Sequence, residues 1–348
     1  RHRLRALENA NLAEQVSTGG NRILQWFENI RIHSENWIME RAMMHHIKSS
    51  FSAVDSETGA AKLLEKFRSL QQSGDLTGLD TGKLINVHMS PADGQGRFET
   101  SLASRNDAHT RPGDPQKPVL LYAVGGGFIL PPAPRQITLV RELAEATGCT
   151  PVIARHRLAP EAPFPHPAND IVDQFLELIE TGHNAQDIVF SGAMAGATLI
   201  LSAALTLRDR GLPLPAGILL FSPWGDLSLS GWSYITRSAS TASPFRMETA
   251  AFCARLYLQD ELSTNPLASP VFADLSGLPP ITIHTSRHDM HFDDALRLVE
   301  NADAAGVEAH IRYWDSPNHH LERFNRRERE KSFDLARKFI SSLMVAQN

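Results

Sequence analysis

The sequence predicts an α/β fold in which a mostly parallel, doubly wound sheet carries helices on both faces. Two observations predict it. Short apolar runs alternate with amphipathic helical segments along most of the chain, which is the order that produces parallel sheets. The run Val119 to Val124 is apolar throughout, as in strands buried on both faces. With 348 residues, 42% of them hydrophobic and 21% charged, the chain is long enough for one large core and a cap.

Eight strands are expected, and two of them precede the apolar run. In chain order they cover residues 84–89, 98–103, 119–124, 151–154, 187–191, 217–221, 281–285 and 310–314. Helices are expected over residues 170–180, 195–209, 293–305 and 328–343. The apolar run Ala195 to Leu207 is shorter than the ~18 residues that a membrane span requires, so it predicts a buried helix.

Two segments are expected to form a helical cap. Residues 1–80 show helical spacing, for example at Trp26, Phe27 and Ile30, and no strand alternation. Residues 225–279 are a long insertion between the sixth and seventh strands, with their own helix over 247–257. An insertion at the carboxyl end of a strand lies over the crevice where such sheets bind ligands. The core is therefore expected to span residues 81–348 apart from this insertion.

Composition excludes several classes of function. The net charge is −5 without a block of like charges, so nucleic acid is not an expected partner. Cys149 and Cys253 lie far apart and lack metal-ligand spacing, which argues against a disulfide framework. The recurring histidines His284, His288 and His291 have no matching ligand pattern, so neither a metal nor a cofactor is expected.

The expected partner is a small molecule. No membrane span is expected, a homodimer stays open, and a cytoplasmic location is the default expectation. The sequence begins at Arg1 without a methionine, so residues upstream of it could be missing.

The segment Ile188 to Ala197 is the most informative about function. An apolar strand runs into an apolar helix, and the segment matches the nucleophile elbow, G-x-S-x-G, everywhere except at the central residue. Gly192 and Gly196 supply the clearance that this strained turn needs. The centre is Met194, whose thioether has no proton to lose and is a weak acceptor. Met194 therefore cannot form an acyl-enzyme by the usual route.

Further segments resemble the hormone-sensitive-lipase family of α/β hydrolases. The stretch Leu121 to Phe128 is similar to the family's H-G-G-G-F loop, and Ser222 to Leu227 resembles its S-P-W-x-D-L. Other similar stretches are Arg157 to Pro165, Pro266 to Pro270 and Leu275 to Pro280. The resemblance extends from about Leu84 to the C-terminus. It implies an α/β-hydrolase fold with a mostly parallel eight-stranded sheet and a helical cap.

The resemblance also implies positions for a triad in the order nucleophile, acid, histidine. Met194 stands at the nucleophile position and Asp289 at the position of the acid. His319 matches the family's histidine, with spacing that favours it over His320. The alternative, that Asp289 and His319 only fasten two loops by a hydrogen bond, stays open.

The same resemblance implies that the amides of Gly125, Gly126 and Ala195 form an oxyanion hole. Val124 stands where the family usually has histidine, and Val124 and Phe128 are expected to line the pocket. The glycines could instead remain only because the loop conformation requires them.

Replacement nucleophiles near the elbow are disfavoured. Ser191 belongs to the strand before the turn, and Thr198 lies one turn into the helix. Cys253, in the expected cap, is a poorer candidate still.

Three functions remain open. The favoured one is a non-hydrolytic enzyme of isomerase, lyase or cyclase type, acting on a carbonyl-containing small molecule. In it His319, oriented by Asp289, moves a proton while the glycine loop stabilises an enolate or alkoxide. The second is a ligand-binding pseudoenzyme or receptor. The third is residual ester hydrolysis, or a carboxylesterase inactivated by an engineered serine-to-methionine change.

Overall fold

The computed structural model describes residues 117–132, 134–237, 247–315 and 326–345. All described residues belong to one compact unit. The expected strands 84–89 and 98–103, the expected helical region 1–80 and His319 lie outside the described residues.

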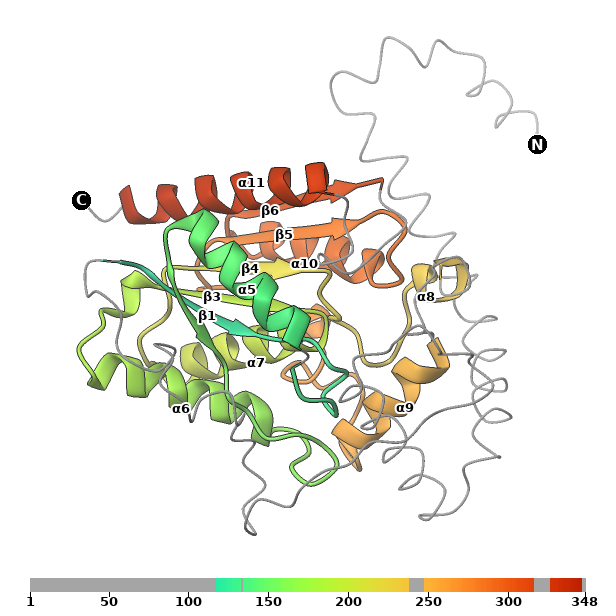
Figure 1. The fold of residues 1–348 in the computed structure, drawn as a ribbon. Coiled ribbons are helices and arrows are strands. Elements are labelled where there is room, and N and C mark those ends of the chain that lie inside the picture. The colour runs from blue at the N-terminus through green and yellow to red at the C-terminus, as the bar shows by residue number, and fades with distance from the viewer. Residues whose placement is uncertain (1–116, 133, 238–246, 316–325, 346–348) are drawn as a thin grey trace. The chain divides into compact units, whose positions relative to one another are not determined.

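The described sheet has six parallel strands in the order β2-β1-β3-β4-β5-β6 (Figure 1). They are β1 (Val119–Ala123), β2 (Thr150–Ile153), β3 (Ile188–Ala193), β4 (Gly217–Phe221), β5 (Ile281–Ser286) and β6 (Ala309–Trp314). Each was expected from the sequence, with ends that differ by at most two residues. This confirms the expected α/β fold with a parallel sheet.

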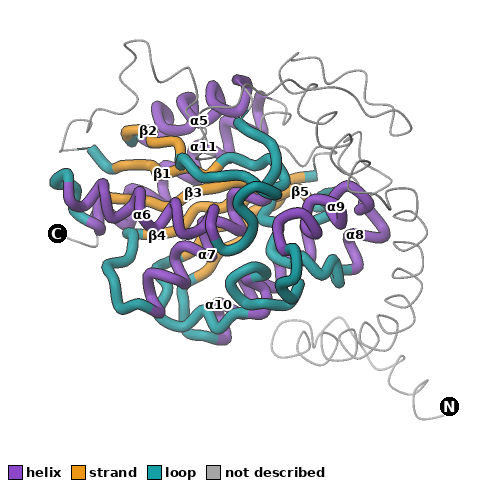
Figure 2. The backbone as a smooth tube through the Cα atoms, turned by 90° about the horizontal axis from the view of Figure 1, so that it is seen from below, coloured by secondary structure: helices purple, strands orange, loops and turns teal. Residues whose placement is uncertain are grey.

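Helices cover both faces of the sheet (Figure 2). On one face lie α5 (Pro134–Thr147) and α11 (Arg326–Val345), which pack against each other. On the other face lie α6 (His166–Glu180), α7 (Ala195–Asp209) and α10 (Phe292–Ala304). The strands β1 and β4 are buried along their whole length, as continuous apolar runs between two helical layers should be.

A large apolar cluster fills the space between the sheet and the α5–α11 face. Leu120 and Tyr122 from β1 and Leu219 from β4 contribute to it, with Leu143 from α5 and Phe333 from α11. On the opposite face α7 is buried from Ala195 to Leu207, which confirms that this apolar run is a core helix. The core therefore surrounds β3 and α7 and holds the turn between them rigidly.

Two helices were not anticipated from the sequence. The helix α5 has its buried residues, such as Leu139, Val140 and Leu143, at helical spacing, so the signal was present. The second, α8 (Trp232–Arg237), has six residues, too few to show a period. It lies in the 225–279 insertion together with α9 (Met247–Leu258) and the short helix η3 (Pro270–Phe272). The one remaining short helix in the described ranges is η2 (Ala185–Asp187), directly before β3.

The helix α9 of the insertion lies against the loop that follows β1. The ring of Tyr257 stacks on Phe128 with centroids 4.0 Å apart, and its backbone oxygen accepts a 2.7 Å hydrogen bond from the amide of Phe164. The insertion therefore packs beside the carboxyl ends of the strands, where ligands of parallel sheets bind. Its role as a cap stays a prediction.

Candidate functional site

The turn between β3 and α7 has an unusual backbone at its centre. Met194 has φ 50° and ψ −118°, a conformation that side-chain-bearing residues rarely adopt. The surrounding chain fixes it: the Met194 amide donates to the Phe221 carbonyl oxygen at 3.0 Å. Its own carbonyl accepts from the amides of Ala197 at 3.0 Å and Trp224 at 3.3 Å. The turn thus has the strained, tightly bonded backbone of an elbow.

The two glycines of the turn are required by close approach. A Cβ atom on Gly192 would lie 2.7 Å from the Gly196 carbonyl oxygen. A Cβ atom on Gly196 would lie 2.8 Å from the Val124 carbonyl oxygen and still closer to that of Ala123. Real Cβ atoms do not tolerate such contacts with backbone, so these positions admit glycine alone without a shift of the chain.

The glycine loop after β1 lies directly beside this turn. A Cβ atom on Gly125 would lie 2.9 Å from the Ala193 carbonyl oxygen and 3.3 Å from the Cβ of Met194. The Gly125 carbonyl accepts from Nε2 of Gln136, in α5, at 3.1 Å, and the Gly126 carbonyl accepts from the Leu130 amide at 3.0 Å. The loop is therefore held through its carbonyl groups and touches the residue-194 turn.

The amides expected to form the oxyanion hole are not used for internal bonding. Within the described part of the chain, the backbone N–H groups of Gly125, Gly126 and Ala195 donate no hydrogen bond to another residue. Ala195 is the first residue of α7, where a helix leaves its amides without internal partners. The three amides therefore have no acceptor among the described residues.

Both residues expected to line the pocket are almost fully buried. Phe128 is 2% exposed and contacts the Trp224 ring at 5.3 Å in addition to Tyr257. Val124 is 7% exposed and belongs to the apolar cluster on the α5–α11 face. A ligand contact by either residue stays a prediction.

Asp289 follows β5 and is fully buried. Its Oδ1 accepts the backbone amide of His291 at 3.0 Å and lies 3.1 Å from His291 Nδ1. His291 is buried as well, between the rings of Trp224 at 5.7 Å and Tyr234 at 5.6 Å. The expected pairing of Asp289 with His319 is not described, because His319 lies outside the described residues.

His291 as a partner of the acid was missed by sequence reasoning. The available signal was its position two residues after Asp289, where a turn brings side chain and backbone together. In the sequence, His291 stands out only as one of several recurring histidines without a metal-ligand pattern. Among the residues that the structure describes, no group of three or more His, Cys, Asp or Glu side chains is placed to hold a metal ion.

A second buried polar cluster holds the segment that is hydrogen-bonded to the elbow. The Oδ2 of Asp294 accepts the amides of Gly225 at 2.9 Å and Asp226 at 3.1 Å and the Tyr234 hydroxyl at 2.5 Å. Burial, with the nearby Asp226 carboxylate, raises the pKa of Asp294 well above its usual range. Arg297 pairs with Asp226 at 2.7 Å. This cluster fixes the segment directly after Trp224, whose amide bonds to the Met194 carbonyl.

The hydroxyl groups of Ser191 and Thr198 are hydrogen-bonded to backbone, and the thiol of Cys253 stays protonated near neutral pH. Ser191 Oγ donates to the Leu219 carbonyl at 2.8 Å, and Thr198 Oγ1 donates to the Trp224 carbonyl. Both hydroxyls are buried. Burial raises the pKa of the Cys253 thiol to about 12, so it is not a thiolate near neutral pH. These contacts agree with the expectation that none of the three replaces a nucleophile at residue 194.

A family model described as the alpha/beta hydrolase fold matches residues 120–322. An acetyl-hydrolase of Streptomyces hygroscopicus is 35% identical over 214 residues, which cover 60% of this chain and 70% of that protein. An esterase of Acinetobacter venetianus is 30% identical over 208 residues, covering 60% and 68%.

Solved structures agree with these relatives. The crystal structure of a hormone-sensitive lipase from a metagenome library is 33% identical, with a TM-score of 0.62, covering 65% of this chain and 78% of that one. In the part of the chain that is described, no helix is both long and apolar enough to cross a bilayer. The parallel sheet, the elbow between β3 and α7 and these matches together place the chain in the α/β-hydrolase-fold family, as an esterase-like member of the hormone-sensitive-lipase group.

Proposed function

We propose that this protein is an enzyme that moves a proton on a carbonyl-containing small molecule without forming an acyl-enzyme. One observation carries the proposal. The elbow backbone, the adjoining glycine loop and three amides without a partner in the described chain are present, while the residue at the focal point is Met194. A site of this kind binds a carbonyl oxygen but offers no atom at residue 194 to attack the carbonyl carbon.

In the proposed reaction, His319 removes a proton from the carbon next to the carbonyl group. The electron pair of the broken C–H bond moves to the carbonyl oxygen, and the amides of Gly125, Gly126 and Ala195 stabilise the resulting enolate. Return of the proton from His319 to another carbon completes an isomerisation. In an elimination, the enolate electrons form a carbon–carbon double bond, the leaving group on the next carbon departs with the electron pair of its broken bond, and it takes the proton from His319. Asp289 would orient the imidazole and stabilise its charged form.

The relatives are named as esterases and an acetyl-hydrolase, and their names suggest an ester as a substrate. A thioether has no proton for a base to remove, so residue 194 cannot serve as the nucleophile of ester hydrolysis. Hydrolysis by a water molecule that His319 activates directly remains a competing function.

A ligand-binding role without turnover is the second candidate. The observation that favours it is the Asp289 carboxylate, whose Oδ1 is held by both the amide and the ring of His291. A carboxylate with those partners fastens its own loop, so its presence does not require a catalytic histidine. The plain test is whether His319 and Asp289 affect turnover.

The experiment is deuterium exchange in D₂O on the full chain, followed by NMR at the carbon next to the carbonyl. Cyclohexanone, 2-butanone and pyruvate are the probes. We expect exchange with at least one probe to be faster than in buffer, and His319→Ala to slow it by about 10²-fold or more, the usual contribution of a general base. Asp289→Asn should slow it too, and His320→Ala serves as the matched control.

Each outcome decides between the candidates. Exchange that is unchanged in His319→Ala and Asp289→Asn contradicts the proposal. Calorimetric binding of a probe without any exchange supports the ligand-binding role. Hydrolysis of p-nitrophenyl acetate by the native chain, lost in His319→Ala, supports the competing hydrolytic function.

A further inference from the structure

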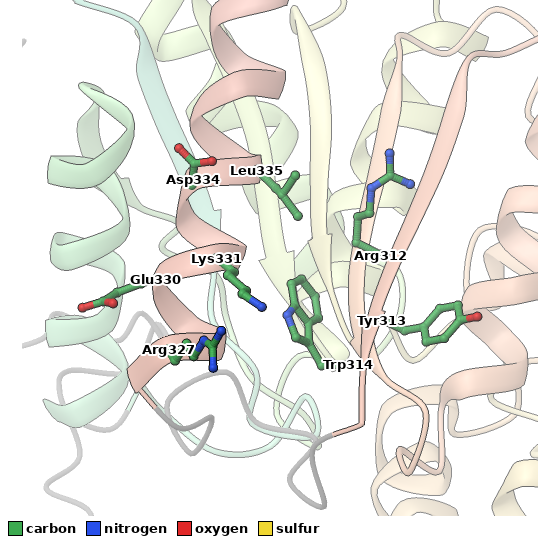
Figure 3. Close-up of a pocket in the computed structure, with 8 residues that line it drawn as sticks. All are labelled: Arg312, Tyr313, Trp314, Arg327, Glu330, Lys331, Asp334 and Leu335. Carbon is green, nitrogen blue, oxygen red and sulfur yellow. The ribbon is translucent and has the colours of Figure 1, made fainter.

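The surface between β6 and α11 holds a groove that the proposed function does not use. It has a volume of about 580 Å³ and lies where α11 leaves the last strand of the described sheet partly uncovered (Figure 3). Arg312 and Trp314 from β6 line one wall, and Arg327, Lys331 and Leu335 from α11 line the other. The groove therefore combines cationic groups with an indole ring and an aliphatic side chain.

The three cations that line the groove have no ion-pair partner in the described ranges of the chain. Among the described residues, Arg312, Arg327 and Lys331 form no ion pair. The two acids at the groove, Glu330 and Asp334, are occupied elsewhere. The two acids that line the groove are thus paired with cations other than Arg312, Arg327 and Lys331.

The acids find their partners along the outer side of α11. Glu330 pairs with Arg326 at 2.7 Å, and Asp334 pairs with Arg337 at 2.5 Å and Lys338 at 2.7 Å. Figure 3 shows the Glu330 and Asp334 carboxylates turned away from Trp314, whereas Lys331 extends toward it. The groove interior is cationic even though the lining residues include both signs of charge.

Behind the indole ring of Trp314, the side chains that bound the groove are uncharged. The Trp314 ring meets the ring of the buried His284 at 5.4 Å, and His284 Nδ1 lies 2.8 Å from the Ser332 hydroxyl of α11. Burial, with the nearby Arg312, lowers the pKa of His284 to about 3, so this histidine is neutral near pH 7. The histidine adds no anion and no further cation to the groove.

We propose that this groove binds a small aromatic anion, with its ring against Trp314 and Leu335 and its phosphate or carboxylate beside Arg327 and Lys331, which lie together on the α11 side of the groove. A flat ring suits the indole face, and guanidinium groups bind the oxygens of phosphate or carboxylate through paired donors. Arg327 lies in the first turn of α11, where the helix dipole also favours negative charge.

The test is isothermal titration calorimetry on the full chain with 1-naphthyl phosphate and 1-naphthoate. Inorganic phosphate and 1-naphthol, titrated separately, carry the charge without the ring and the ring without the charge. We expect at least one naphthyl anion to bind more tightly than either of these two. The double variant Arg327→Gln with Lys331→Gln should weaken that binding about tenfold or more, as loss of a charged hydrogen bond does.

The matched control is Arg155→Gln with Lys338→Gln, which removes the same charge from exposed sites outside the groove, leaves Asp334 paired with Arg337, and should change Kd less than twofold. Trp314→Leu should abolish the preference for the naphthyl anion over inorganic phosphate, and Trp314→Phe should retain it. Equal weakening by the two double variants, or inorganic phosphate binding as tightly as the naphthyl anions, overturns the proposal. So does the absence of binding by both naphthyl anions.

Discussion

The turn after β3 and the segment after β5 lie at the same edge of the parallel sheet but are built from different residues. At the turn after β3, glycine and alanine bring three stretches of backbone within contact of one another. After β5, Asp289 and His291 are fully buried and bonded to each other. The turn after β3 supplies a fixed backbone conformation, and the segment after β5 supplies ionisable side chains.

This difference explains how an elbow can persist around a methionine. The strained backbone at Met194 is held by bonds from Phe221, Ala197 and Trp224, all of them through main-chain atoms. None of these bonds depends on the side chain at residue 194. The reactive atom can therefore be absent while the turn stays intact, and the two regions should respond differently to substitution.

The largest effect should come from Met194→Ser, which tests whether the turn after β3 kept its catalytic geometry. A hydroxyl there, with the amides of Gly125 and Ala195 nearby, should raise hydrolysis of p-nitrophenyl acetate by about 10³-fold or more, because removal of a nucleophile costs a hydrolase at least that much. Initial rates measure it, and Met194→Ala is the control. If the serine variant hydrolyses the ester no faster than the alanine variant, the turn has the backbone of an elbow but not its catalytic geometry.

One added methyl group at the turn after β3 should lower the stability of the protein. Gly196→Ala forces a Cβ against the carbonyl oxygens of Ala123 and Val124, so we expect a loss of about 3 kcal/mol in the free energy of unfolding. Gly306→Ala is the matched control: its Cβ meets open space, and only its φ of 73° costs about 1 kcal/mol. Urea unfolding compares the two. Equal losses would show that crowding at the turn is not what requires Gly196.

Much of the first region could be predicted from the sequence and little of the second. Gly192 and Gly196 are a local pattern, and the strand and helix around them have clear periods. The backbone partner of Asp289 has a local signal, because an aspartate often accepts the amide two residues further on, but no signal shows that the His291 ring bonds to the same oxygen. The cluster of Asp294 with Gly225 joins residues 69 positions apart, which no local signal reports. The helix α8 was missed for its length and α5 despite its spacing.

The segment after β5 should depend on its carboxylate for stability. Asp289→Ala leaves the amide and ring of His291 without their acceptor in a buried site, so we expect a loss of about 2 kcal/mol in the free energy of unfolding. The control is Asp303→Ala on the exposed side of α10, with an expected change below about 0.5 kcal/mol. A loss at Asp289 no larger than the control loss would mean that this pair contributes nothing to the fold.

The smallest effect expected, taken per unit of pH, is a pH dependence that arises from β5 itself. His284 is buried against Phe221 and Trp314, and its pKa is lowered to about 3. Between the ordinary histidine value near 6.5 and this lowered value, the unfolded chain binds a proton on this side chain that the folded chain does not. Its contribution to the free energy of unfolding should therefore fall by about 1.4 kcal/mol for each unit of pH below about 6.5.

His284→Gln removes that titration and retains a group able to hydrogen-bond Ser332. Urea unfolding at pH 7, 6 and 5 should give a shallower loss of stability for this variant than for the native chain. His310→Gln, the same substitution on the exposed side of β6, should leave the slope unchanged. Parallel slopes for native chain and His284→Gln would mean that His284 takes up its proton in the folded state as readily as in water. Residue 284 would then be accessible to water. Of the two regions compared, only the turn after β3 would still adjoin strands that exclude water, because β5 would not.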